Sequence, residues 1–90
     1  MIYADLNSFF ELEVSSNYGK QLLLDTIELD IQKRISLKDD KGNVYKLIIK
    51  YNENKVEIKD WIVSPDETQE AYTTTLAIFI QALKEYTPRQ

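Results

Sequence analysis

The side chains that most often carry out chemistry in proteins are scarce in this chain. It contains no cysteine and no histidine, which excludes thiolate nucleophiles, imidazole bases and zinc sites built from their side chains. Its two glycines, Gly19 and Gly42, are too few for a glycine-rich phosphate loop. We therefore expect a protein that is not an enzyme and that uses no cofactor.

Carboxylates are more plentiful, and three of them cluster at Asp25, Glu28 and Asp30. Their spacing does not match a calcium-binding loop, which needs oxygen ligands at fixed positions, a glycine and a later glutamate. Acidic residues on a solvated face keep small proteins in solution, and that role accounts for the cluster. The sequence predicts no metal site.

Lysine side chains recur at alternate positions through the middle of the chain. If the apolar residues of these segments point inward, the basic residues share the opposite face of a sheet, with an aromatic ring at its margin. Cations that follow the backbone and a ring that stacks on bases are typical of proteins that bind single-stranded nucleic acid. The candidate residues are Arg34, Lys38, Lys46, Lys50, Lys55, Lys59 and Trp61. A solvated sheet face whose lysines oppose aggregation has the same pattern.

Charge is unevenly distributed along the chain, whose net charge is −4. Residues 1–30 carry six acids and one base, residues 31–60 carry five acids and eight bases, and residues 61–90 carry four acids and two bases. The overall acidity argues against non-specific binding of duplex DNA, which depends on neutralising phosphates. Surfaces of opposite sign on one small domain suit a protein partner or self-association.

Alternation of apolar and polar residues, which is typical of half-buried strands, occurs in four segments. It predicts strands over residues 8–15, 26–38, 44–51 and 55–63. The second segment also has apolar residues spaced by four, so a helix over residues 22–33 is the alternative there. Residues 39–43 predict a hairpin turn in which Gly42 takes a positive φ.

A helix is predicted near the C-terminus, over residues 65–86. Ser64 can cap it, Pro65 suits its first position, and Glu67 completes a capping box. The β-branched residues in its middle favour a strand instead, so a strand over residues 73–80 is the alternative.

The middle of this predicted helix is apolar on nearly all sides. A helix of that kind is buried on more than one face. In a domain this small, the second burial surface predicts a partner, and we expect a homodimer. The interface residues would be Leu76, Ile78, Phe79 and Ile80.

Together these elements predict one α+β domain over residues 1–90, a four-stranded antiparallel β-meander with one C-terminal α-helix packed on its apolar face. The expected core is Phe10, Leu12, Val14, Ile27, Leu29, Ile35, Leu37, Leu47, Ile49, Val56, Ile58, Leu76, Phe79 and Leu83. The longest apolar run, Leu76 to Ile80, is far too short to cross a membrane. The first residues do not resemble a secretory signal, so we expect a cytoplasmic protein.

The function that these observations favour is that of a small non-enzymatic protein-interaction or regulatory module. Binding of single-stranded nucleic acid through the basic face is the alternative. Nine lysines against two arginines, with ten isoleucines and five asparagines, indicate an AT-rich genome such as that of a low-GC bacterium or its phage.

Overall fold

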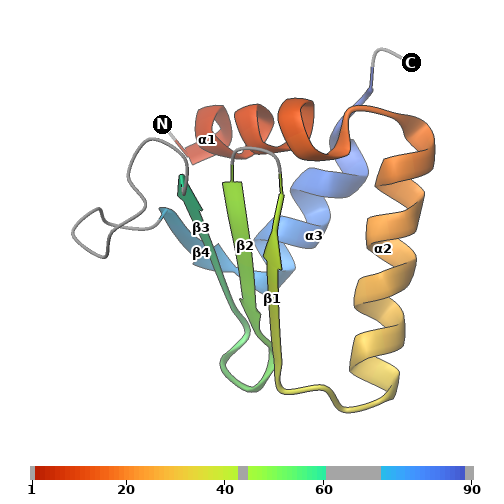
Figure 1. Ribbon diagram of the computed structural model, residues 1–90, viewed down its shortest axis with the longest axis vertical. Helices are drawn as coiled ribbons and strands as arrows, with labels where there is room; N and C mark the ends of the chain where they lie inside the picture. Colours follow the sequence, from red (N-terminus) through yellow and green to blue (C-terminus); the bar gives the residue numbers. More distant parts are fainter. Residues whose placement is uncertain (1, 43–44, 61–71, 89–90) are drawn as a thin grey trace.

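The computed structural model describes residues 2–42, 45–60 and 72–88. Within these ranges the chain forms helices at both ends and a sheet between them (Figure 1). In chain order the elements are α1 (Ile2–Phe9), the π-helical η1 (Phe10–Val14), α2 (Asn17–Gln32), β1 (Leu37–Lys41), β2 (Tyr45–Lys50), the 3₁₀-helical η2 (Tyr51–Glu53), β3 (Lys55–Asp60), β4 (Tyr72–Thr75) and α3 (Leu76–Glu85).

The sheet is a meander whose strands pair in chain order, β1-β2-β3-β4, and every pair is antiparallel. α3 follows β4 directly and packs against β3 and β4, behind the sheet in the view of Figure 1. α1 crosses one end of the sheet, and α2 stands beside β1 (Figure 1). The predicted α+β fold, a four-stranded antiparallel sheet with a C-terminal helix, is therefore confirmed.

The N-terminal segment is helical, so the strand predicted over residues 8–15 is wrong. The buried residues Leu6, Phe10 and Val14 are four apart, which is the spacing of one helix face. Leu12, which the alternation places with the core, is 48% exposed. Alternation over so few residues also fits a helix, and packing against the sheet selects the helix.

α2 is the helix that the sequence offers as an alternative over residues 22–33, and it begins earlier, at Asn17. The strand predicted over residues 26–38 is therefore wrong for residues 26–36, and only residues 37 and 38 belong to a strand, β1. Ser16 caps the helix, because its Oγ accepts a hydrogen bond from the backbone N–H of Gly19 at 3.0 Å. Such a cap satisfies one of the donors that a first turn leaves without a partner.

β1 presents its side chains in the opposite sense from the prediction. The register pairs Lys38 with Ile49 and Asp40 with Leu47, so the two charged residues share the inner face of the sheet with these buried neighbours. Leu37, expected in the core, lies on the outer face and is 54% exposed.

The hairpin turn predicted over residues 39–43 is wrong for residues 39–41, which belong to β1, and Gly42 does not take a positive φ. Its N–H donates to the Tyr45 carbonyl at 2.8 Å. A Cβ at this position would collide with the carboxylate of Glu13, so a larger residue here would displace that side chain. That carboxylate accepts a hydrogen bond from the Tyr45 N–H at 2.9 Å, so Glu13 ties η1 to the start of β2.

The central hairpin, formed by β2 and β3, agrees with the strands predicted over residues 44–51 and 55–63 as far as the described residues extend. Asn54 takes a left-handed conformation, with φ of 53°, in the turn between them. Four inward-facing residues of the hairpin are buried, as predicted: Leu47, Ile49, Val56 and Ile58.

The C-terminal helix is shorter than predicted. Residues 72–75 form β4 rather than helix. The alternative of a strand over residues 73–80 is therefore correct for residues 73–75 and wrong for residues 76–80, which belong to α3. α3 begins after Thr75, whose Oγ1 accepts a hydrogen bond from the N–H of Ile78 at 3.1 Å. The cap predicted at Ser64 to Glu67 lies outside the described residues.

The core fills the space between the inner face of the sheet and the helices. Its buried apolar residues are Leu6, Phe9, Phe10, Val14, Ile27, Leu47, Ile49, Val56, Ile58, Leu76, Phe79, Ala82 and Leu83. Three phenylalanine rings form its centre, with centroids 5.7 to 6.1 Å apart. The expected core residues Leu12, Leu29, Ile35 and Leu37 are instead exposed, at 39 to 54%.

Candidate functional site

The outer face of the sheet carries four of the predicted basic residues. The register places Lys46 directly opposite Lys59 and Lys50 directly opposite Lys55, with Ile48 and Glu57 between the two pairs. We call Lys46, Lys50, Lys55 and Lys59 the lysine face. Like charges opposite each other in an antiparallel pair are destabilising, so this arrangement opposes folding unless anions compensate it.

Carboxylates compensate part of the lysine face. Glu57 lies 3.0 Å from the ammonium of Lys50 and 3.4 Å from that of Lys55, and Asp39 lies 3.6 Å from the ammonium of Lys46. The hydrogen bond from Lys50 lowers the pKa of Glu57, and the same bond raises the pKa of Lys50. An anionic ligand on this face would have to compete with these ion pairs.

The remaining predicted basic-face residues are not on the lysine face. Arg34 lies in the turn between α2 and β1, where it takes a left-handed conformation with φ of 59°. Lys38 faces inward, and its ammonium lies 3.1 Å from Asp40 and 3.8 Å from Asp30. The prediction that Arg34 and Lys38 join the outer face is therefore wrong. Trp61 lies outside the described residues.

Lys38 belongs to a polar network that ties α2 to the sheet. Its side chain and that of Asp30 are only 15% and 19% exposed. Asp30 also accepts a hydrogen bond from the Tyr51 hydroxyl at 2.8 Å. Burial, and after it this hydrogen bond, raises the pKa of Tyr51 well above its ordinary value. The network holds the last turns of α2 near β1 and the end of β2.

α2 leaves much of its apolar surface uncovered. It carries six leucines and isoleucines, and Ile27 is the one that is fully buried. Tyr18, Leu22 and Leu29 are 79%, 52% and 47% exposed. Because they are four and seven residues apart, they lie along one side of the helix, and we call them the α2 stripe.

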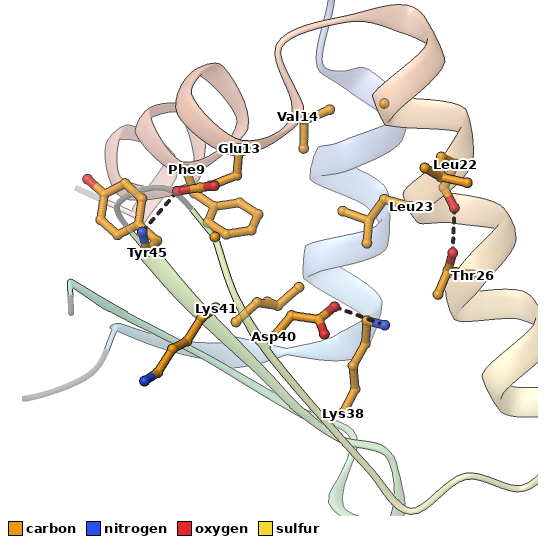
Figure 2. A pocket seen from close by; sticks show the side chains of 13 residues that line it. Phe9, Glu13, Val14, Leu22, Leu23, Thr26, Lys38, Asp40, Lys41 and Tyr45 are labelled. Carbon is orange, nitrogen blue, oxygen red and sulfur yellow. Dashed lines mark hydrogen bonds and ion pairs between the residues drawn. The ribbon is translucent and has the colours of Figure 1, made fainter. Parts of the chain in front are cut away.

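A cleft of about 330 Å³ lies between α2 and β1, beside the α2 stripe (Figure 2). Leu22 belongs to both the stripe and the wall of the cleft. The other apolar walls come from η1, α2 and the sheet, and the polar lining includes Glu13, Lys38 and Asp40. The side chains of Lys38 and Asp40 project from β1 and meet in an ion pair within the cleft (Figure 2).

The predicted dimer interface is divided by the fold. Leu76 and Phe79 are 6% and 0% exposed, inside the core, so their side chains are not available to a partner. Ile78 is 41% exposed on α3. Ile80 is half-buried and lines a groove of about 380 Å³ between α2 and α3, which Ile31 also lines.

Sequence reasoning misses both the α2 stripe and the cleft. Alternation assigns Leu29 to the core, and its helical spacing from Tyr18 and Leu22 is informative only once the segment is known to be a helix. The cleft brings together residues from η1, α2 and β1, which no local pattern connects.

The described residues include neither a membrane-spanning helix nor an acidic metal site. No helix among them is long and apolar enough to cross a membrane. They contain no group of three or more acidic side chains placed to hold a metal ion.

Comparison with known proteins identifies no relative. No protein-family model matches the chain, and neither a curated protein nor a solved structure matches it significantly. Its own geometry and chemistry are therefore the basis for inferring function.

Proposed function

We propose that this chain is a non-enzymatic protein-binding module that uses the α2 stripe. The observation that carries the proposal is that Tyr18, Leu22 and Leu29 lie on one side of a helix and are 47 to 79% exposed. Solvent-exposed apolar side chains that are contiguous on a surface mark interaction sites more often than isolated ones do. A helix with such a stripe presents anchors of the kind that recognise another helix.

The charges beside the stripe favour a basic partner. Asp25 and Glu28 are exposed on α2, and residues 1–30 carry six acids and one base. Asp25 lies between Leu22 and Leu29 in the sequence of this helix. An amphipathic helix with lysines or arginines beside its apolar face would match both the apolar and the acidic character of the surface.

The test uses a synthetic amphipathic helix of leucine and lysine, labelled with fluorescein and followed by anisotropy. We expect saturable binding that falls about thirtyfold in the double variant Leu22→Ser and Leu29→Ser, since each half-exposed leucine contributes about 1 kcal/mol. Ile78→Ser is the matched control because Ile78 is 41% exposed on another helix, and it should bind as the parent does.

Two results would overturn the proposal. One is unchanged affinity of the Leu22→Ser and Leu29→Ser variant. The other is equal binding of a control peptide in which glutamate replaces every lysine, because the acidic surface should reject it.

Binding of single-stranded nucleic acid on the lysine face is the second candidate. The specific observation is the direct opposition of Lys46 and Lys59 and of Lys50 and Lys55, which a bound phosphate backbone would relieve. A labelled oligonucleotide should then bind with an affinity that falls steeply with salt. Changing Lys46 and Lys59 to Gln should weaken binding, whereas Lys33→Gln, at the end of α2, should not. Absence of binding at low salt would rule this candidate out.

Two further expectations belong to the proposal. A homodimer would use Ile78 and Ile80, the two predicted interface residues that are not fully buried, and light scattering at high concentration should report twice the monomer mass. A monomer mass would exclude the dimer and leave the α2 stripe as the proposed interface.

The expected cytoplasmic location is tested by fractionation of cells that express the chain.

A further inference from the structure

The cleft between α2 and β1 has apolar walls and a charged floor. Phe9, Leu22 and Leu47 line it from three different elements. Lys41 is at its rim, but the side chain of Lys41 points away from α2 (Figure 2). An aliphatic chain could therefore lie along the walls while a polar end group reaches the floor.

The charges of the cleft favour a cation. Lys38 is already offset, since its ammonium lies 3.1 Å from Asp40 and 3.8 Å from Asp30. The Glu13 carboxylate adds a third negative charge at the end of the cleft near Tyr45 (Figure 2). The cleft lining thus holds two carboxylates, Glu13 and Asp40, with Asp30 beside it against Lys38, while the ammonium of the other lining lysine, Lys41, points away from α2.

Asp40 is the carboxylate best placed to receive a ligand. Its side chain is 61% exposed, and Oδ2 is the oxygen that pairs with Lys38. Asp40 lies opposite Leu47 in the register, so its carboxylate stands beside an apolar wall of the cleft.

We propose that this cleft receives a lysine or arginine side chain of the partner, with its aliphatic stem against Leu22 and Leu47 and its cationic end at Asp40. Long basic side chains commonly bury their stems in this way while the charge stays paired or hydrated. The inference rests on the proposed function, since Leu22 belongs to both the α2 stripe and the cleft. It adds that the partner carries a basic residue beside its apolar face.

The first test needs no partner. n-Butylammonium, n-butanol and butyrate are titrated separately into ¹⁵N-labelled protein. We expect butylammonium to shift the amide signals of Leu22, Asp40 and Gly42 at millimolar concentrations, and butyrate to leave them unchanged. Equal shifts with n-butanol and butylammonium would overturn the proposal, because the cleft would then select only the alkyl chain.

Two variants of adjacent residues make the second test. Asp40→Asn removes the proposed acceptor, whereas Asp39→Asn removes a carboxylate that faces the outer side of the sheet and pairs with Lys46. We expect Asp40→Asn to weaken butylammonium binding about fivefold and Asp39→Asn to leave it unchanged. Equal effects of the two substitutions would refute the assignment, since they would show a general effect of charge.

The same variants separate this inference from the proposed function. If the leucine–lysine peptide binds the α2 stripe but its affinity is unchanged by Asp40→Asn, the stripe is supported as a protein-binding site and the cleft assignment is wrong. If butylammonium binds at Asp40 but the peptide does not bind, the cleft is a cation site and the proposed function fails.

Discussion

The attachment of α2 to the rest of the domain can be tested by comparing two substitutions on the same helix. Ile27 is 1% exposed and Leu29 is 47% exposed. Ile27→Ala removes three buried carbons, each worth about 0.8 kcal/mol, and leaves a cavity that adds to the loss. We therefore expect Ile27→Ala to lower the free energy of unfolding by about 3 kcal/mol.

Leu29→Ala removes the same number of carbons, but about half of that side chain is already in water. Without a cavity term, the expected loss is about 1 kcal/mol, and the higher helix propensity of alanine reduces it slightly. Urea unfolding followed by circular dichroism at low micromolar protein gives both values. The comparison is well matched because both residues belong to one helix and lose the same number of carbons.

One result would refute the view that the monomer leaves the α2 stripe uncovered. If Leu29→Ala destabilises the protein as much as Ile27→Ala does, then Leu29 is buried in solution. Repeating the unfolding at higher protein concentration identifies the cause, since a stripe buried between two copies would make stability depend on concentration.

Three other predictions concern local interactions. Ser16→Ala removes the acceptor of the Gly19 N–H and should cost about 1 kcal/mol in unfolding free energy, measured by urea denaturation. The folded state raises the pKa of Tyr51 above its ordinary value of 10.0. The protonated hydroxyl therefore stabilises the fold fully below that pH, and this stabilisation decreases as pH rises further. Thermal melts from pH 9 to 11 should show this decrease, and Tyr51→Phe should reduce it. Lys50 lowers the pKa of Glu57 below its ordinary value of 4.5, so this ion pair stabilises the fold above that pH and is lost as pH falls through the folded pKa. Glu57→Gln should therefore flatten the acid side of the plot of melting temperature against pH. An unchanged plot would contradict the pairing.

The central hairpin was predictable because its determinants are local. β2 and β3 are joined by a short turn, and their alternating residues face one core surface. A shift of one residue would expose every apolar side chain on this face. The same reasoning places Lys46, Lys50, Lys55 and Lys59 together on the outer face, as the register shows.

The region of residues 8–38 was not predictable in the same way. Leu23, Ile27 and Ile31 fit a helix, and the odd positions from residue 27 fit a strand, so both patterns are present in one stretch. Neighbours from distant parts of the chain decide between them. α2 contacts α3, and Lys20 donates to the carbonyls of Lys84 and Tyr86 at 2.7 Å, contacts that a strand at this position would not make.

The fold class, the central hairpin, most of the core and the lack of cysteine and histidine chemistry follow from composition and from patterns within a few residues. The exposure of Leu22 and Leu29 and the inward orientation of Lys38 do not, because they depend on packing between distant segments. Both outcomes depend on where α2 lies relative to β1. That placement is fixed by contacts far apart in sequence, such as the ion pair of Lys38 with Asp30 and the hydrogen bond of Tyr51 to Asp30. The candidate site is built from the surfaces that this placement leaves uncovered.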